Sequence, residues 1–468
     1  MGTMVIYHCK NLKCSYMRNL HASVFCAALC ISGFGAFSQV DFGPAEKIID
    51  SIRTTGFPAD TIRVTELGAV GDGTTDSRTA IIRAIDACHQ KGGGVVLLEG
   101  GTFFSKGPLT LKNNVNLHIA AETKLLFSPY PEDYLPAVFT RWEGVEAFNY
   151  SPMIYTYGQE NIAITGKGMI DGSASEIWVP FRQKQGPAQN RMRDFSDWQA
   201  PLHERVFGEG DFIRPSMIQF VYCSRILVEG VTLTNSPLWM LHPVYSSDII
   251  IRGVTFNSMV INNDGIDIDS SEKALIEQCH FRTGDDAIVF KSGRDRDGWR
   301  VNRPARDIVV RNCTSPETLH GIAFGSEMSG GIENVYIENF KLGKVKSEAI
   351  QFKANQDRGG YIRNVHIRNV EVEEAGNHLF FFTNGYHSYR GGNAPSSFHD
   401  IHMENVSCTF AKYTLQLQGL SDAPLYNITF SRIKVDKAGS IFNRMEYFRD
   451  ILLEHYSVDG KSVKLPEP

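Results

Sequence analysis

The sequence predicts an all-β protein, built as a single solenoid in which the chain winds into a parallel β-helix. Three observations predict this fold class. A short run of alternating aliphatic residues recurs along the chain, its copies begin roughly 23 to 36 residues apart, and a glycine or an asparagine stands between the two halves of many copies. A unit recurring at this period indicates a solenoid, and an apolar spacing of two indicates strands. We therefore expect each copy to form one coil.

The copies and their bends can be assigned to residues. The copies begin at Ile226, Ile249, Ala274, Ile308, Val335, Val365, Ile401, Ile428 and Ile451. Glycine and asparagine adopt positive φ more readily than other residues, so we expect bends at Gly230, Gly253, Asn312, Asn339, Asn369 and Asn405. Residues 114–120 and 161–172 resemble earlier coils. Helical repeats are the competing architecture, but the apolar spacing here is two and valine and isoleucine dominate.

One helix is predicted at about residues 77–91. Its apolar face consists of Ala80, Ile81, Ala84, Ile85 and Cys88. Asp76 is expected to cap its N-terminus, and Gly92 is expected to end it. Because a solenoid leaves an open end that must be covered, we expect this helix to cap the first coil.

The N-terminus is typical of an export signal that begins at Met17. A positive segment with Arg18 and His21 precedes an apolar run over residues 22–37 and a cleavage site before Gln39. Residues 1–38 are therefore assigned to a signal peptide with an upstream extension, and residues 39–468 to the mature β-helix. A buried N-terminal helix is the alternative. No later segment is long and apolar enough to span a bilayer, so we expect an exported protein, periplasmic or secreted.

The composition argues against several classes of protein. The chain has 468 residues, 42% of them hydrophobic and 21% charged, with a formal net charge of -5, which is typical of a large globular core and gives no sign of a nucleic-acid partner. The cysteines after the signal stand at positions 88, 223, 279, 313 and 408. Their spacing indicates neither a disulfide framework nor a zinc site.

A polar insertion at about residues 174–213 interrupts the repeat. It carries Trp178, Arg182, Arg191, Arg193, Trp198 and Arg205. Because a solenoid can extend such a loop sideways, and long loops in compact proteins are often functional, we expect the insertion to form a wall of a binding cleft.

Carboxylates gather in two neighbouring copies, in the stretches NNDGIDIDS and TGDDAIVFKSG. Asp264, Asp285, Asp286, His320 and Lys353 occupy similar places in successive copies. Coils stack about 4.8 Å apart, so we expect these side chains to share one face. Clustered carboxylates hold a metal ion or move protons, and a pair with unequal pKa values can hydrolyse a glycosidic bond.

Basic residues close to this cluster in the sequence suit an anionic sugar. Arg294, Arg296 and Arg358 lie near it, in addition to Lys353 and His320. Guanidinium groups bind carboxylates through paired hydrogen bonds. The substrate is therefore expected to be acidic.

Four ordered motifs resemble glycoside hydrolase family 28, the polygalacturonases. They are Asn262-Asn263-Asp264, Gly284-Asp285-Asp286, Leu319-His320-Gly321 and Gln351-Phe352-Lys353. Stretches such as FKSGRDRDG, GSEMSGG and RGGYIRNV are similar to the bacterial, exo-acting branch. The resemblance runs from about Thr65 to the C-terminus and implies a right-handed β-helix of the pectin-lyase-like kind.

The resemblance implies an inverting hydrolase of α-linked galacturonic acid in pectin. Asp285 would be the general acid, and Asp264 and Asp286 would hold and deprotonate a water molecule, with the acid and base about 6.5 to 9.5 Å apart. His320 would tune the acid. The residues assigned to substrate binding are Asn262, Lys353, Gln351, Arg294, Arg358 and Tyr386, of which Tyr386 would stack on a sugar or belong to the core. No metal or cofactor is expected, and the protein is expected to be a monomer.

The chain departs from the family pattern at Gln351, where the family has arginine. A neutral amide there leaves open a neutral neighbouring sugar, such as the rhamnose of rhamnogalacturonan, as the alternative substrate. The insertion at residues 174–213 would wall one end of the cleft and favours exo cleavage.

Three other functions are compatible with the sequence. A pectate lyase on the same fold would use the aspartates to bind calcium and would release products with a new double bond. A non-catalytic, polysaccharide-binding β-helix would not need Asp285. A hydrolase of a non-uronate sugar would accept neutral substrates.

Overall fold

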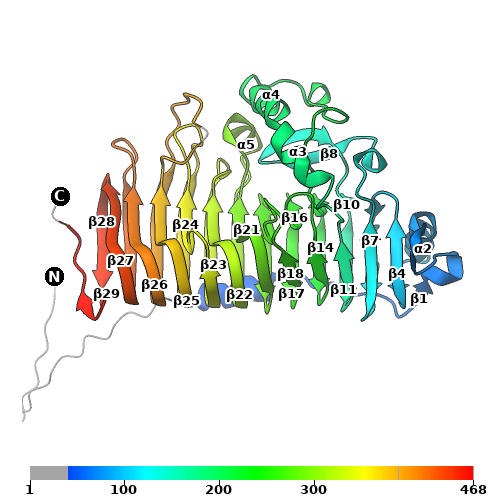
Figure 1. The fold of residues 1–468 in the computed structure, drawn as a ribbon, viewed down its shortest axis with the longest axis horizontal. Helices are drawn as coiled ribbons and strands as arrows, with labels where there is room; N and C mark the ends of the chain where they lie inside the picture. The colour runs from blue at the N-terminus through cyan, green and yellow to red at the C-terminus, as the bar shows by residue number, and fades with distance from the viewer. Residues whose placement is uncertain (1–40, 388, 467–468) are drawn as a thin grey trace, which may run out of the picture. The chain divides into compact units, whose positions relative to one another are not determined.

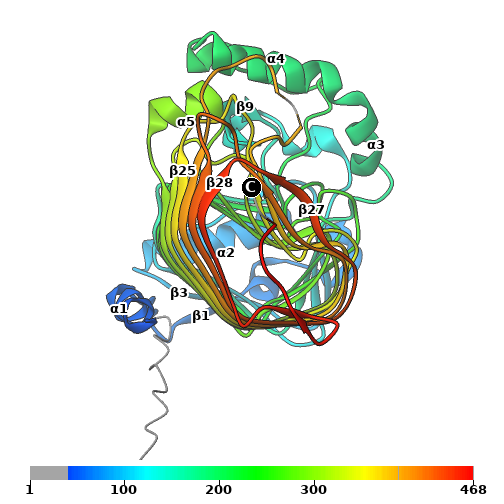
Figure 2. The same ribbon diagram turned by 90° about the vertical axis from the view of Figure 1, so that its left-hand side faces the viewer.

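The computed structural model describes residues 41–466 except Ser388, and they form a right-handed parallel β-helix (Figure 1). The expected signal peptide at residues 1–38 lies outside the described residues. Each full coil contributes to three ladders of parallel strands, which run along the solenoid on different sides of one apolar core (Figure 2). The predicted fold class is therefore confirmed.

The first ladder contains the predicted repeats. It begins with β1 Thr61–Arg63, β3 Gly94–Leu98, β6 Val115–Ile119, β11 Glu160–Gly166, β14 Ser224–Glu229, β17 Ser247–Arg252 and β20 Glu272–Glu277, and it ends with β28 Phe448–Glu454. All of the predicted copy starts are register partners, from Ile226 opposite Ile249 to Ile428 opposite Ile451. The sequence alone therefore predicted the coil register.

The other two ladders use shorter strands. The second comprises β2 Asp72–Asp76, β4 Gly101–Ser105, β7 Thr123–Phe127, β12 Met169–Asp171, β15 Thr232–Thr234 and β18 Thr255–Ser258. The third comprises β5 Leu109–Thr110, β10 Ile154–Tyr157, β13 Ile218–Val221, β16 Leu241–Val244, β19 Ile266–Asp269 and β24 Ile350–Lys353.

In the later coils, long strands run through the bends and so belong to more than one ladder. They are β21 His280–Lys291, β22 Ala305–Gly325, β23 Ile332–Val345, β25 Tyr361–Thr383, β26 Ser397–Gln418 and β27 Leu425–Glu446. The hairpin of β8 Val138–Trp142 and β9 Val145–Asn149 is antiparallel, as is the pair of β29 Ser457–Val458 and β30 Lys461–Ser462.

The predicted bends all have positive φ, between 53° and 79°. The asparagines among them stack from coil to coil: the amide of Asn339 donates to the Asn312 oxygen at 3.1 Å, and Asn369 donates to Asn339 at 3.1 Å. Each asparagine thus supports its own left-handed backbone and satisfies the neighbour's side chain.

The helices lie outside the coils. They are α1 Gly43–Ser51, α2 Arg78–Gln90, α3 Trp178–Lys184, α4 Gly186–Asp197 and α5 Asp295–Val301, with short 3-10 turns at Val64–Leu67, Pro131–Tyr134 and Leu202–Glu204. Figure 2 shows α3 and α4 beyond one side of the coils and α1 beside the other. No helix of the described ranges is long and apolar enough to cross a membrane.

The capping helix was predicted nearly to the residue, with one correction. All five residues of its expected apolar face are buried. The capping position, however, is Ser77, which makes no side-chain cap bond. Asp76 instead accepts hydrogen bonds from the backbone N–H of Arg78 and of Lys106, both at 3.0 Å, because it ends strand β2 beside the next turn.

Aromatic rings stack along the core with the spacing of the coils. Phe352 is fully buried, and its ring lies parallel to those of Phe324 and Phe382, with centroids 4.4 Å apart in each case. Such a ring fills the layer between two neighbouring coils.

Replacing this ring should therefore destabilise the solenoid. Phe352→Ala is expected to lower the free energy of unfolding by about 3–5 kcal/mol, because the loss of a buried ring leaves a cavity. Leu452→Ala is the control, since Leu452 is 47% exposed, and a change within about 0.5 kcal/mol is expected there. Urea unfolding followed by circular dichroism would measure both; equal effects would contradict the assignment.

Candidate active site

Three aspartates of the two aspartate-rich stretches, Asp264, Asp285 and Asp286, line one polar cavity of about 250 Å³. Its lining includes Asn262, Asp264, Asp285, Asp286, Lys291, Glu327 and Lys353 from the coils, and Glu143, Arg182, Gln189, Arg193, Tyr386 and His387 from the segments that extend beyond them. The predicted clustering of Asp264, Asp285, Asp286 and Lys353 on one face is thus found. His320 stands beside Asp285, outside the lining.

The cluster forms where the second ladder passes into the third. Asp264 precedes β19, Asp285 and Asp286 lie within β21, and Asp286 is the register partner of His320 in β22. The register shifts between Thr283 and Asp286. In a regular strand two successive side chains point to opposite faces, so this irregularity allows adjacent aspartates to reach the same cavity.

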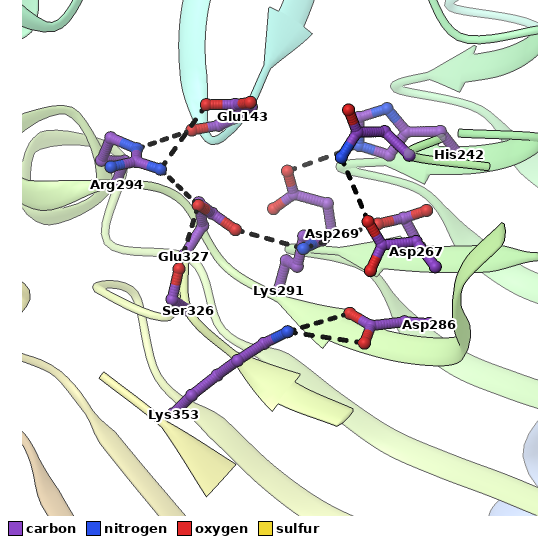
Figure 3. Close-up of polar contacts among 12 residues, drawn as sticks. Glu143, His242, Asp267, Asp269, Asp286, Lys291, Arg294, Ser326, Glu327 and Lys353 are labelled. Atoms are coloured by element: carbon purple, nitrogen blue, oxygen red, sulfur yellow. Dashed lines mark hydrogen bonds and ion pairs between the residues drawn. The ribbon is translucent and has the colours of Figure 1, made fainter. Parts of the chain in front are cut away.

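Asp286 is held as an anion. The Lys353 ammonium donates to its Oδ2 at 3.1 Å (Figure 3). The Gln351 amide donates to its Oδ1 at 2.8 Å. Burial alone would raise its pKa, but Lys353 and, to a smaller extent, His320 outweigh burial, so the pKa of Asp286 is lowered.

The pKa of Asp285 is shifted in the opposite direction, upward. Burial and the neighbouring Asp286 charge raise its pKa, and His320 and Lys353 offset this only in part. The Asn262 amide donates to its Oδ2 at 3.1 Å, and His320 Nε2 lies 3.9 Å from its Oδ1. Two adjacent carboxyl groups therefore differ in the pH at which they ionise, which is the arrangement that separates an acid from a base.

Asp264 is the most deeply perturbed of the three. It is 3% exposed, its Oδ1 has no hydrogen-bond partner among the described residues, and burial followed by Asp267, Asp285 and Asp286 raises its pKa well above the usual range. This differs from the expectation that Asp264 shares the base role as an anion. Its unpartnered oxygen lies at a cavity that can admit water.

A second set of charged residues pairs around the cavity, and three of them, Glu143, Lys291 and Glu327, line it. Lys291 donates to Glu327 at 3.1 Å and lies 3.6 Å from Asp267, while Arg294 pairs with Glu327 and Glu143 (Figure 3). Lys291 and Glu327 were not singled out from the sequence, although both lie in the stretches FKSGRDRDG and GSEMSGG. Those stretches were the available signal.

Three predicted substrate-binding residues are placed differently. Arg294 is 4% exposed and Arg358 is 1% exposed; Arg358 pairs with Asp295 and donates to the Ser326 carbonyl at 2.6 Å. Neither of them lines the cavity, and nor does Gln351, which is 1% exposed and bonded to Asp286. Proximity in sequence could not show which way these side chains point.

Tyr386 and Asn262 do line the cavity. Lys353 Nζ lies 5.5 Å from the centre of the Tyr386 ring, which is partly buried and is not part of the core. Asn262 is oriented by Arg214, whose Nη2 donates to the Asn262 oxygen at 2.7 Å.

The insertion reaches the same cavity. Arg182 on α3, and Gln189 and Arg193 on α4, contribute to its lining. Arg193 pairs with Glu143 at 3.2 Å, whereas Arg182 has no ion pair within the described part of the chain. Across the opening, Arg390 of the loop between β25 and β26 pairs with Asp194 and lies 3.5 Å from Asp197, both on α4.

Two distances bear on metal binding and on stereochemistry. Single ligand atoms of Asp285, Asp286 and His320 lie within 4.8 Å of one another, so these three residues could also bind a cation.

The nearest oxygens of Asp285 and Asp286 are accordingly closer than the expected spacing of about 6.5 to 9.5 Å. That expectation is wrong for this pair, because the register shift brings adjacent residues to one side.

The fold and this carboxylate site together define a glycoside hydrolase. The chain belongs to the glycosyl hydrolases family 28, whose family model matches residues 140–451. A second family model, described as rhamnogalacturonase A/epimerase, pectate lyase-like, matches residues 61–123. The resemblance carried by the four motifs is therefore confirmed.

Several relatives are named polygalacturonases. The solved structure of a hyperthermoactive exopolygalacturonase from Thermotoga maritima shares 35% identity with a TM-score of 0.83, over 88% of this chain and 95% of that one. An exo-poly-alpha-D-galacturonosidase of Dickeya chrysanthemi is 23% identical over 88% of this chain and 76% of its own length. A probable polygalacturonase of Vitis vinifera is 31% identical over 60% of this chain, and the match spans about half of that relative, 54%.

The effect of Lys353 on the pKa of Asp286 can be tested directly. Lys353→Met should raise the pKa of Asp286, because burial and the neighbouring carboxyl groups would then act without their main opposing charge. A carbon-13 NMR titration of aspartate-labelled protein would measure the shift. Lys341→Met, which removes a surface partner of Glu371, is the control; an unchanged Asp286 titration in Lys353→Met would contradict the assignment.

Proposed function

We propose that the protein hydrolyses α-linked galacturonic acid in pectic chains and removes single units from chain ends. Inversion is carried over from the family resemblance and not from the short distance between Asp285 and Asp286. The observation that carries this proposal is the opposite shift of the pKa values of the adjacent Asp285 and Asp286. A glycosidic hydrolase needs one carboxyl group that holds a proton and another that accepts one.

The proposed reaction follows from these two groups. Asp285 gives its proton to the glycosidic oxygen as the bond from that oxygen to C1 breaks. Asp286 takes a proton from a water molecule as the water oxygen forms the new bond to C1. Asp264, which lines the same cavity and has an unpartnered Oδ1 among the described residues, would hold that water.

Cations of the cavity support an acidic sugar. Lys353 lies under Tyr386, and Arg182 is exposed and free of an ion pair within the described residues. A carboxylate of the substrate would provide the missing partner. Arg182 belongs to the insertion, which had been expected only to form a wall.

An ion pair between two segments that line the cavity supports exo cleavage. The insertion helix α4 lines the cavity, and the loop carrying Tyr386 and His387 is tied to the same helix through Arg390. A chain that threads through an open groove would have to pass this bridge, whereas a chain end would not.

Rhamnogalacturonan is the second candidate substrate. The residue that suggests it is Gln351, which stands at the family's arginine position. Because Gln351 is hydrogen-bonded to Asp286 and does not line the cavity, this position offers no charged group to a second acidic sugar.

The decisive experiment is mass spectrometry of products from galacturonate and rhamnogalacturonan oligomers, with a chelator present. Saturated galacturonic acid released one unit at a time is expected, and Asp285→Asn should lower the rate by about 10²- to 10⁴-fold, as for other general acids. Proton NMR of the first product should show the inverted anomer. Unsaturated products, or activity lost with the chelator, would instead indicate a metal-dependent lyase.

We also propose that the chain is exported and acts as a monomer. The support for export is the apolar run at residues 22–37 with its cleavage site. Expression from Met17 in a Gram-negative host should yield a mature N-terminus at Gln39 in the periplasmic or secreted fraction, read by N-terminal sequencing. An uncleaved cytosolic product would contradict it.

A further inference from the structure

A carboxylate outside the cavity lining stands next to His320. Glu348 lies just before β24, one coil beyond β22, and its Oε2 is 3.0 Å from His320 Nδ1. The other ring nitrogen of His320, Nε2, lies 3.9 Å from Asp285 Oδ1. The imidazole ring is therefore placed between a carboxylate on one side and the proposed acid on the other.

Glu348 is itself held by several donors. Ser347 Oγ donates to its Oε2 at 2.6 Å, Asn377 Nδ2 donates to its Oε1 at 2.6 Å, and His378 Nδ1 lies 3.4 Å from the same oxygen. Burial would raise the pKa of Glu348, but His320 and His378, with Ser347, outweigh it and hold the pKa well below the usual range. Glu348 is thus a fixed anion with 7% exposure.

Such an anion needs an explanation. A buried charge is costly unless its partners offset the cost, and the proposed proton transfers do not use Glu348. Its Oε2 lies 3.0 Å from His320 Nδ1, a distance at which a carboxylate attracts the N–H of a ring nitrogen. The Asn377 and Ser347 bonds fix the carboxylate, and the carboxylate in turn restrains the ring.

We propose that Glu348 is a positioning residue, which fixes the His320 ring so that Nε2 faces Asp285. This inference rests on the proposed hydrolase function, in which Asp285 is the acid. A histidine oriented by an outer carboxylate is a recurring arrangement in active sites. Here the outer carboxylate comes from the next coil, through the same stacking that brings His320 beside Asp286.

A double-mutant cycle tests the inference. Glu348→Gln should lower kcat about 10- to 100-fold, as for other outer partners of an oriented histidine, and should leave KM unchanged because Glu348 does not line the cavity. If Glu348 acts through His320, the double variant Glu348→Gln/His320→Gln should be no slower than His320→Gln alone. If the double variant lost kcat by the product of the two single losses, the proposal would be overturned.

Control variants separate positioning from stability. Glu317→Gln removes a carboxylate from a surface pair with Lys346 on the same solenoid and should leave kcat unchanged. Glu348→Asp keeps the charge and should recover part of the lost kcat. A Glu348→Gln protein with a lower melting temperature but the kcat of the parent would also overturn the proposal.

Histidine NMR separates this inference from the proposed function. In nitrogen-15-labelled protein without substrate, the His320 ring signals, assigned with His320→Gln, should change in Glu348→Gln and remain unchanged in Glu317→Gln. Unchanged His320 signals in Glu348→Gln would overturn the inference. If the parent protein released nothing from any galacturonate oligomer, the proposed function would fail, and the spectra would still decide whether Glu348 holds His320.

Discussion

The register between successive coils is the constraint on which the rest of this structure depends. Parallel ladders place a residue of one coil directly beside its partner in the next, about 4.8 Å away. The copy starts from Ile226 to Ile451 are register partners throughout, so one position in the coil becomes a column along the solenoid. The site is one such column. Asp286 is the register partner of His320, and Glu348 of the next coil lies beside the His320 ring.

Burial of charge shapes the chemistry of that column. Each aspartate near the cavity would hold its proton if burial acted alone, and only nearby cations change this. Lys353 and Gln351 contact Asp286 and not Asp285. The Lys353 charge lowers the pKa of Asp286, whereas burial and the Asp286 charge keep the pKa of Asp285 raised. The difference arises from one strand, β24, which delivers both partners to one side of the aspartate pair.

The solenoid also leaves its turns free to grow without disturbing the ladders. The β8–β9 hairpin, the α3–α4 insertion and the loop carrying Tyr386 all leave the coils on the side of the cavity. Their contacts with one another, such as Arg390 with α4, enclose the cavity. Catalytic groups thus come from the rigid coils, and the access to them is set by segments that the coils do not constrain.

Local sequence was sufficient for the coil starts, the bends at Gly230 and Asn312, the helix over residues 78–90 and the aspartates of the site. These features follow from residue type and short-range spacing, which act within a few residues. Three features depend on the folded chain. Arg182 lines the cavity, Gln351 is hydrogen-bonded to Asp286, and Glu348 contacts His320. The physical reason is that the repeat determines which backbone positions stack, whereas the direction of a single polar side chain at a bend, and its partner in the next coil, do not recur from copy to copy.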